Sequence, residues 1–194
     1  MRPRSDCHPL KFRAFVSVDI SPNDRLAALL EHLRGSSASL KVVRPTNLHL
    51  TLKFLGDTDE ALVDDIVNAI ADSTRGCQPF EVRLRGMGAF PSLSNIRVIW
   101  VGIEDGKELV KISEEIDSSL ADIGLERDRR GFKPHLTVAR AKGVIGGDMI
   151  QDFVAANAAT DYGDYRVSEV ILKKSVLTPQ GPIYSDVRGI SLVD

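Results

Sequence analysis

Two histidine–threonine pairs recur in the chain in the same frame. His49 and Thr51 lie in "NLHLTLKF", and His135 and Thr137 lie in "KPHLTVAR", 86 residues further on. Residues i and i+2 of a strand point to the same face, so each histidine would share a face with its threonine. The repeat predicts that the two pairs have one common role. The other two histidines of the chain have no such neighbours, and we expect no catalytic role for them.

The chemistry that these residue types suit is the cleavage of a phosphodiester. Two facing imidazoles can act as general acid and general base, because an ordinary pKa near 6.5 lets one be neutral while the other is protonated. Threonine hydroxyls donate hydrogen bonds to an anion without adding negative charge. The four side chains therefore predict in-line attack on phosphorus, provided that the two segments lie side by side.

Three other kinds of site fit these residues less well. Two histidines could bind zinc, but neither motif has an Asp, Glu or Cys at a characteristic spacing to supply a third ligand, so we predict neither a metal nor a cofactor. The chain has no G-x-S-x-G sequence of a serine hydrolase. The glycine-rich "RGMGAFP" lacks the Gly-Lys-Ser/Thr ending of a phosphate-binding loop and is predicted to be a turn or bulge between strands.

Hydrophobic periodicity predicts the elements that position the motifs. Helices are expected at residues 21–35, 59–74, 105–123 and 148–156, and strands at 12–20, 48–55, 80–90, 96–103, 133–141, 166–177 and 183–189. The connection "PSLSN" makes a hairpin of the third and fourth strands, so part of the sheet is antiparallel. The segment "KGVIGGD" at 142–148 is predicted to be a loop.

The element order and the internal repeat predict the fold class. We expect an α+β protein with two pseudo-symmetric lobes, each rich in β-α-β units, whose antiparallel sheets face a central cleft. Residues 1–194 would form a single two-lobed domain.

Composition excludes several classes of protein. No segment approaches the roughly 18 uninterrupted apolar residues of a membrane helix, and the basic N-terminus lacks the apolar core of a signal peptide, so we expect a cytoplasmic protein. Two cysteines are too few for a disulfide framework. The 25 Lys and Arg are balanced by 27 Asp and Glu, so any binding of RNA must depend on a local patch.

With these flanks, the paired motifs resemble the two-histidine phosphoesterases, and within them the RNA 2′,3′-cyclic phosphodiesterases, also called 2′-5′ RNA ligases. The resemblance covers most of the chain, through "RAFVSVDIS", "RPTNLHLTLKFLGD", "MGAFPS", "RVIWVGI", "GFKPHLTVARAK" and "VILKKSVLTPQGPIY". It implies a bilobal fold and metal-independent opening of a 2′,3′-cyclic phosphate to a 2′-phosphate. It makes His49 and His135 the catalytic pair and Thr51 and Thr137 the phosphate binders.

The resemblance also implies finer roles. By analogy, His135 is the base that activates water and His49 the acid that protonates the leaving 3′ oxygen, although the symmetry of the motifs does not assign the direction. Phe54 and Arg140, five residues after each histidine, occupy places that the family uses for the terminal nucleotide. An odd offset would point them away from the histidines, so either a bulge re-aims them or Phe54 is a core aromatic.

A basic run, "ERDRRGFKPH", precedes the second motif and contains Arg127, Arg129, Arg130 and Lys133. It is either a solvated loop or the patch that attracts an RNA backbone, and we assign Arg130 to substrate binding. The expected partners are RNA 3′ ends or small cyclic nucleotides, with no membrane contact, and we expect a monomer. Two alternative functions remain: 2′-5′ joining of RNA ends in the same cleft, and a module that binds an RNA end or nucleotide without turnover.

Overall fold

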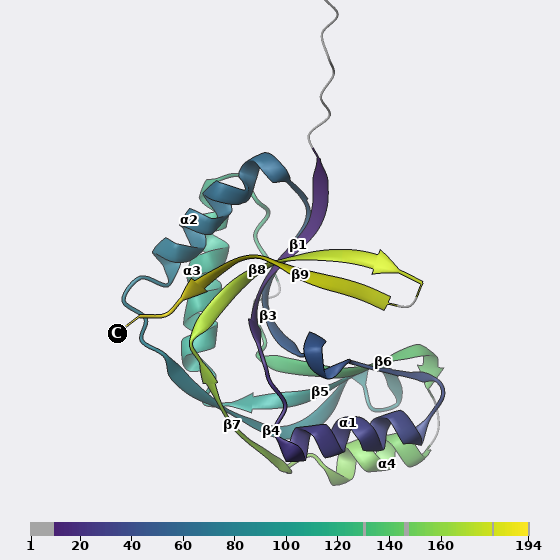
Figure 1. The fold of residues 1–194 in the computed structure, drawn as a ribbon. Coiled ribbons are helices and arrows are strands. Elements are labelled where there is room, and N and C mark those ends of the chain that lie inside the picture. Colours follow the sequence, from purple (N-terminus) through teal and green to yellow (C-terminus); the bar gives the residue numbers. More distant parts are fainter. Residues whose placement is uncertain (1–9, 130, 146–147, 180, 194) are drawn as a thin grey trace, which may run out of the picture.

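The chain forms two antiparallel sheets, which a computed structural model describes over residues 10–129, 131–145, 148–179 and 181–193 (Figure 1). In spatial order, the first sheet contains β3 (His49–Asp59), β1 (Lys11–Asp19), β8 (Glu169–Thr178) and β9 (Gly181–Ser191). In the same way, the second sheet contains β2 (Leu40–Val42), β6 (His135–Ile145), β5 (Asn95–Glu104), β4 (Phe80–Ser92) and β7 (Asp161–Val167). All pairings within them are antiparallel.

Each sheet has two helices packed against it, as Figure 1 shows. Helices α2 (Val63–Ser73) and α3 (Lys107–Asp122) contact the first sheet, and α1 (Asp24–Ser36) and α4 (Asp148–Ala156) contact the second. Their apolar faces are buried; those of α1 and α3 contain Leu26, Leu29, Leu30, Leu33, Leu109, Ile112, Ile116 and Leu120. Two short 3-10 helices, Pro45–Asn47 and Glu60–Leu62, precede β3 and α2. The predicted α+β class with two lobes is thus confirmed.

The two lobes do not correspond to the two halves of the chain. The chain leaves the first sheet after β1, places α1 against the second, and returns to the first only with β3. It crosses again between β7 and β8, so the prediction of one strand over 166–177 is wrong. Ser168 separates two strands of different sheets. Both strands bury apolar side chains on either side of it, but the alternation changes phase at the crossing, from Tyr165 and Val167 to Val170 and Leu172.

Other boundaries also differ from those predicted. Strand β2 was not predicted, because three residues are too few for a periodic pattern. The loop predicted at 142–148 is wrong over 142–145, which continue β6, and at Asp148, which begins α4. Residues 146–147 of that segment lie outside the described part of the chain.

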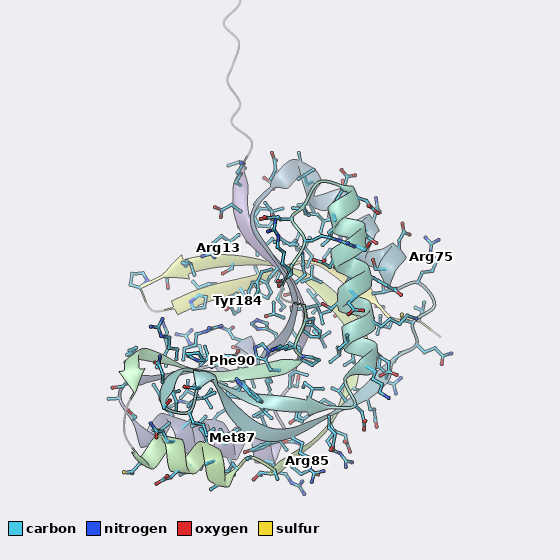
Figure 2. The ribbon with its side chains drawn as sticks, turned by 180° about the vertical axis from the view of Figure 1, so that it is seen from behind. Arg13, Arg75, Arg85, Met87, Phe90 and Tyr184 are labelled. Atoms are coloured by element: carbon cyan, nitrogen blue, oxygen red, sulfur yellow. The ribbon has the colours of Figure 1, made fainter. Side chains whose placement is uncertain are left out.

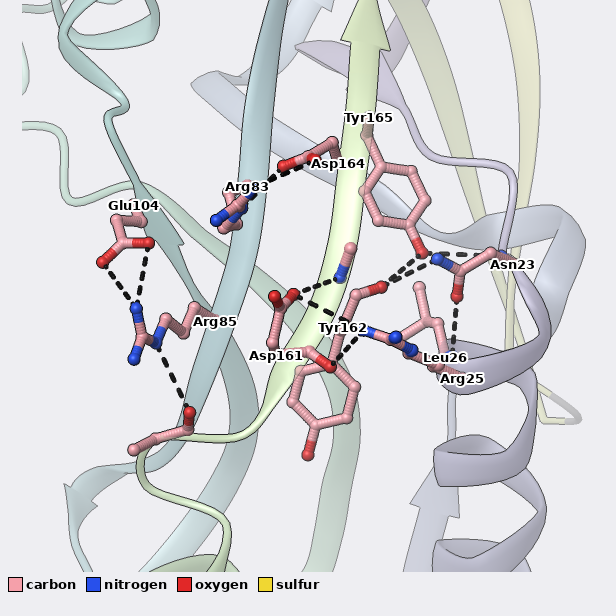
Figure 3. A network of polar contacts seen from close by, with 12 residues as sticks. Asn23, Arg25, Leu26, Arg83, Arg85, Glu104, Asp161, Tyr162, Asp164 and Tyr165 are labelled. Atoms are coloured by element: carbon pink, nitrogen blue, oxygen red, sulfur yellow. Dashed lines mark hydrogen bonds and ion pairs between the residues drawn. The ribbon is translucent and has the colours of Figure 1, made fainter.

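A network of polar contacts joins β7, the outer strand of the second sheet, to α1 on one side and to β4 on the other (Figure 3). The Asn23 side chain caps α1 by accepting from Leu26 N at 3.0 Å, and its Nδ2 donates to the Tyr162 carbonyl of β7 at 2.8 Å. Arg83 of β4 binds Asp164 of β7 through two hydrogen bonds of 2.7 and 3.1 Å. The outer strand of this sheet is therefore held on both sides. No helix in the described residues is long and apolar enough to span a membrane.

Candidate active site

A cleft of about 1400 Å³ lies between the two sheets and is lined by both His–Thr motifs. Strands β3 and β6, which carry the motifs, contact each other. Figure 2 shows Tyr184 on β9 and Phe90 on the second sheet, at opposite walls of this cleft. The predicted site residues that line it are His49, Thr51, Phe54, His135, Thr137 and Arg140. The seventh, Arg130, lies outside the described residues.

The two histidines are held by the same hydrogen bond. Nδ1 of His49 lies 2.7 Å from the carbonyl oxygen of Asn47, and Nδ1 of His135 lies 2.7 Å from that of Lys133. A carbonyl oxygen only accepts, so Nδ1 of each neutral ring carries the hydrogen. Nε2 is then the nitrogen with a free lone pair in both rings, and it can accept or release a proton. The repeated motif therefore selects the same tautomer twice.

Aromatic rings flank each imidazole. The ring centroids of Phe15 and Tyr184 lie 5.0 and 5.2 Å from that of His49, and those of Phe90 and Trp100 lie 5.2 and 6.5 Å from that of His135. The rings of Tyr184 and Phe90 meet the imidazoles edge-on, with interplanar angles of 86° and 89°. Such contacts fix the plane of each imidazole and cover part of it from water.

None of these four aromatic residues was predicted. Phe15 and Trp100 lie on β1 and β5, the strands that pair with the two motif strands. The segments "FVSV" and "WVGI" each precede one motif in the sequence and begin with an aromatic residue. Comparing them could have suggested Phe15 and Trp100. Tyr184 and Phe90 come from other parts of the chain, and no local pattern relates them to the histidines.

Burial lowers the pKa of His49 below its ordinary value of 6.5, because the charged ring would lose hydration. The hydrogen bond to the Asn47 carbonyl and the nearby carboxylate of Asp19 act in the opposite direction but do not outweigh it. The Asp19 carboxylate accepts a hydrogen bond from the buried ammonium group of Lys173, with Nζ 2.7 Å from Oδ2. At neutral pH the free protein therefore holds His49 as a neutral imidazole.

This lowered pKa predicts a pH dependence of stability. Between the folded-state pKa and the ordinary value of 6.5, the unfolded chain binds more protons than the folded one, so stability rises with pH through that window. The wild type should therefore lose stability as the pH falls below 6.5, and His49→Gln should lose less. Urea unfolding over this range measures the difference.

The matched control for this experiment is His32→Gln, because His32 is exposed on α1 and lies outside the cleft. It should keep the pH dependence of the wild type. An unchanged pH dependence in His49→Gln would contradict the burial argument.

A β-bulge directs Phe54 toward the cleft. Ser17 of β1 pairs with Thr51, but Val16 pairs with Lys53, so Leu52 is the extra residue in β3. Leu52 and Lys53 are both buried although they are consecutive, whereas Phe54 is 68% exposed and lines the cleft. The bulge reverses the alternation of the strand, so a residue five positions after His49 returns to the histidine's face. The alternative that Phe54 is a core aromatic is wrong.

The second motif carries the same bulge. Trp100 of β5 pairs with Thr137 and Ile99 with Ala139, so Val138 is the extra residue of β6. It follows His135 by three positions, as Leu52 follows His49. Val138 and Ala139 are both buried, and Arg140 is exposed and lines the cleft. The internal repeat therefore extends from the His–Thr pair to the bulge and to the residue that the bulge re-aims.

Helix α3 holds the first bulge from behind. The Ser113 hydroxyl donates to the Leu52 carbonyl at 2.8 Å, in a buried position. The ammonium of Lys53, also buried, binds the Asp117 carboxylate on α3 and donates to the Glu126 carbonyl at 2.6 Å. The bulge, α3 and the segment that leads to His135 are thereby connected.

The described residues that line the cleft are mostly basic where they are charged. They include Lys41, Arg44, Lys53, Arg127, Arg129, Lys133 and Arg140, against Glu114, Asp117 and Asp128. A chain with a net charge of −2 thus has a local excess of positive charge at the motifs. An anionic ligand is attracted to this surface and not to the protein as a whole.

No group of three or more His, Cys, Asp and Glu side chains gathers to hold a metal ion among the described residues.

The Thr51 and Thr137 hydroxyls have no hydrogen-bond partner within the described part of the chain. They are thus able to donate to a ligand in the cleft.

Two antiparallel sheets around a cleft, with one His–Thr motif on each side, are the arrangement of the two-histidine phosphoesterases. A family model described as "LigT like Phosphoesterase" matches the chain twice, over residues 18–100 and 101–184. The chain belongs to the LigT-like phosphoesterases. The two matches meet within β5, and each contains one His–Thr motif.

Relatives and solved structures agree with this family. The chain is 39% identical to an RNA 2′,3′-cyclic phosphodiesterase of Methanothermobacter thermautotrophicus, over 94% of this chain and 100% of that one. It is 37% identical to one of Archaeoglobus fulgidus, over 91% and 98%. A crystal structure of a Thermus thermophilus protein is similar with a TM-score of 0.78 at 28% identity, over 93% of this chain and 97% of that one.

Proposed function

We propose that this chain hydrolyses RNA 2′,3′-cyclic phosphate ends to 2′-phosphate ends without a metal ion, and that His49 and His135 are the catalytic pair. The observation that carries the proposal is the convergence of both His–Thr pairs on one cleft, with the same ring nitrogen free in each histidine. The relatives named RNA 2′,3′-cyclic phosphodiesterase, at up to 39% identity over nearly the whole chain, support it.

The reaction would proceed by one in-line displacement. Nε2 of His135 takes a proton from water as the water oxygen bonds to phosphorus, and the bond from phosphorus to the 3′ oxygen breaks. Nε2 of His49 gives its proton to that leaving oxygen. The Thr51 and Thr137 hydroxyls donate to the non-bridging oxygens, where charge builds in the transition state.

The lowered pKa of His49 places a condition on this assignment. An acid must hold a proton when the substrate reacts, but His49 is neutral in the free protein at neutral pH. The negative charge of the bound phosphate favours the imidazolium, so substrate binding would raise the pKa of His49 and charge it. An imidazolium with a lowered pKa also releases its proton to a leaving group more readily.

Two further residues would bind the terminal nucleotide. Phe54 would stack on its base, and Arg140 would donate to the base or to a phosphate. Their support is that both bulges bring these side chains to the cleft. We further propose that the chain is one domain, because its sheets exchange segments and neither lobe is a continuous stretch of sequence.

The test is an assay with a short RNA that ends in a 2′,3′-cyclic phosphate, with and without EDTA. We expect the RNA to gain one water and to carry a 2′-phosphate, at an unchanged rate in EDTA. Phosphorus NMR distinguishes the 2′-phosphate from the 3′-phosphate. Adding an RNA with a 5′-hydroxyl shows whether a 2′-5′ bond forms in place of hydrolysis. A 3′-phosphate product, or loss of activity in EDTA that added metal restores, would overturn the proposal.

A further inference from the structure

Next to His49, three charged side chains of the first sheet form an ionic network. Lys173 of β8 donates to the Asp19 carboxylate of β1 at 2.7 Å and to the Asp186 carboxylate of β9 at 2.6 Å. The Lys173 side chain is 8% exposed, against 43% for Asp19 and 59% for Asp186. Burial alone would lower the pKa of Lys173, but the hydrogen bonds to the two carboxylates raise it above its ordinary value. The ammonium group therefore stays charged.

Sheet register places this network on the face of the first sheet that carries His49. Asp19 is the direct partner of His49 in the pairing of β1 with β3, so the two side chains point to the same face, with Cβ atoms about 4.5 to 5.5 Å apart. Lys173 is the direct partner of Phe15, whose ring centroid lies 5.0 Å from that of His49. Of the described residues that line the cleft, none belongs to the network. Its members therefore do not touch the substrate and can act on the reaction only through His49.

The charges around His49 make the Asp19 carboxylate its counter-ion. Asp19 on β1 favours the protonated ring, whereas Lys173 on β8 and Arg140 on β6 oppose it. Tyr184 of β9 also contacts the ring, but burial raises the pKa of its hydroxyl, so it adds no charge at neutral pH. His49 becomes an imidazolium whether it gives a proton to the leaving group or takes one from water. In either role, a negative charge beside the ring stabilises a state that the reaction requires.

We propose that Asp19 and Lys173 are positioning residues of the reaction and act through His49. The Asp19 carboxylate stabilises the imidazolium, and Lys173 holds this carboxylate in place and reduces its effect on the ring. Without Asp19, the two remaining cations would disfavour the imidazolium; without Lys173, the carboxylate would hold the proton too tightly. This inference rests on the proposed function, because it gives these residues a part in that reaction.

The first test follows the titration of His49 in the free protein by NMR of the imidazole Hε1 proton. The midpoint should move to lower pH in Asp19→Asn and to higher pH in Lys173→Met, each by about one pH unit, as for a charge a few ångströms away. A general loosening of the fold would not move the midpoint in opposite directions. His135 lies on the other sheet, so its resonance, assigned with His135→Gln, is the internal reference and should titrate as in the wild type.

The second test is the pH dependence of kcat on a cyclic-phosphate RNA. The limb of the profile that reports His49 should follow the NMR midpoint, to lower pH in Asp19→Asn and to higher pH in Lys173→Met. This limb is the alkaline one if His49 is the acid and the acidic one if it is the base. The double variant should lie closer to the wild type than either single variant, because it removes opposite charges.

Two controls remove the same kinds of charge elsewhere in the first sheet. Lys174→Met changes the neighbour of Lys173 on β8, which is exposed and lies with Nζ 5.2 Å from the centroid of the Phe12 ring. Asp57→Asn changes an exposed carboxylate near the far end of β3. Both variants should leave the titration of His49 and the kcat profile unchanged.

The outcomes separate this inference from the function on which it rests. An unchanged midpoint in Asp19→Asn, or a kcat profile that does not follow the midpoint, would overturn the inference while the wild type still opens the cyclic phosphate. Asp19→Asn keeps the side-chain shape at a partly exposed position, so it decides the test alone if Lys173→Met does not fold. If the wild type opens no cyclic phosphate at any pH, the proposed function is rejected and the inference with it.

Discussion

Replacing either His49 or His135 with alanine should lower kcat for opening a 2′,3′-cyclic phosphate by about 10²- to 10⁴-fold, the usual contribution of a general acid or base. Each substitution removes an imidazole whose Nδ1 is fixed by a backbone carbonyl and whose Nε2 is free for proton transfer. Neither ring is fully buried, so the fold should remain intact. The measurement is kcat at saturating substrate, together with the thermal midpoint of each variant.

His32→Ala is the control for this experiment. His32 stacks on Phe153 at 4.2 Å between α1 and α4, outside the cleft, so its loss should leave kcat unchanged. Full activity in either His49→Ala or His135→Ala would reject the paired mechanism.

A substrate with a good leaving group assigns the two roles. A p-nitrophenyl ester of a nucleoside 2′-phosphate needs no acid to protonate its leaving group, but it still needs a base to activate water. His49→Ala should therefore lose far less activity on this ester than on the cyclic phosphate, whereas His135→Ala should lose activity on both. The opposite result would exchange the roles of acid and base.

The sequence was sufficient to predict which four side chains would act together, provided that the two motif strands lie side by side. The period of two in a strand places each histidine and its threonine on one face, and the repeated frame predicts equivalent positions in two similar lobes. Both inferences depend on local geometry alone. The structure agrees, since β3 and β6 contact each other and all four side chains line one cleft.

The sequence raised a bulge as one of two alternatives but could not decide between them, because the groups that hold the first bulge are distant in sequence. The Leu52 carbonyl is satisfied by Ser113, and Lys53 by Asp117, both on a helix that follows two intervening strands. A regular strand would have placed Phe54 on the other face, so its position stayed open until the pairing of β3 with β1 showed the bulge. For the same reason, Tyr184 could not be related to His49 before the pairing of β9 with β8 brought it there.

Lys41 illustrates a second limit of the sequence. Its strand has only three residues, and nothing in "LKV" indicates a cleft. Lys41 lines the cleft beside its pairing partner Arg140, a residue that the bulge at Val138 turns toward the cleft. A cleft residue of this kind is defined by sheet register and has no motif of its own.

Removing the hydroxyl of Thr51 or Thr137 should have the second largest effect. Thr51→Val and Thr137→Val keep the volume of the side chain but remove the donor, and each should lower kcat by about 10²- to 10³-fold, as loss of one oxyanion donor does. The charge that these hydroxyls meet develops in the transition state, so kcat should fall more than KM rises. Steady-state kinetics on a cyclic-phosphate RNA measures both.

The serine variants are the matched controls, because Thr51→Ser and Thr137→Ser keep the hydroxyl and should keep most of the activity. The double valine variant tests whether the two strands act on one phosphate. If each threonine holds a different non-bridging oxygen, the two losses should multiply; if both hold the same oxygen, the second loss should be smaller than the first. A rise in KM with kcat unchanged would show that the threonines bind substrate and transition state equally, which contradicts their proposed role in stabilising developing charge.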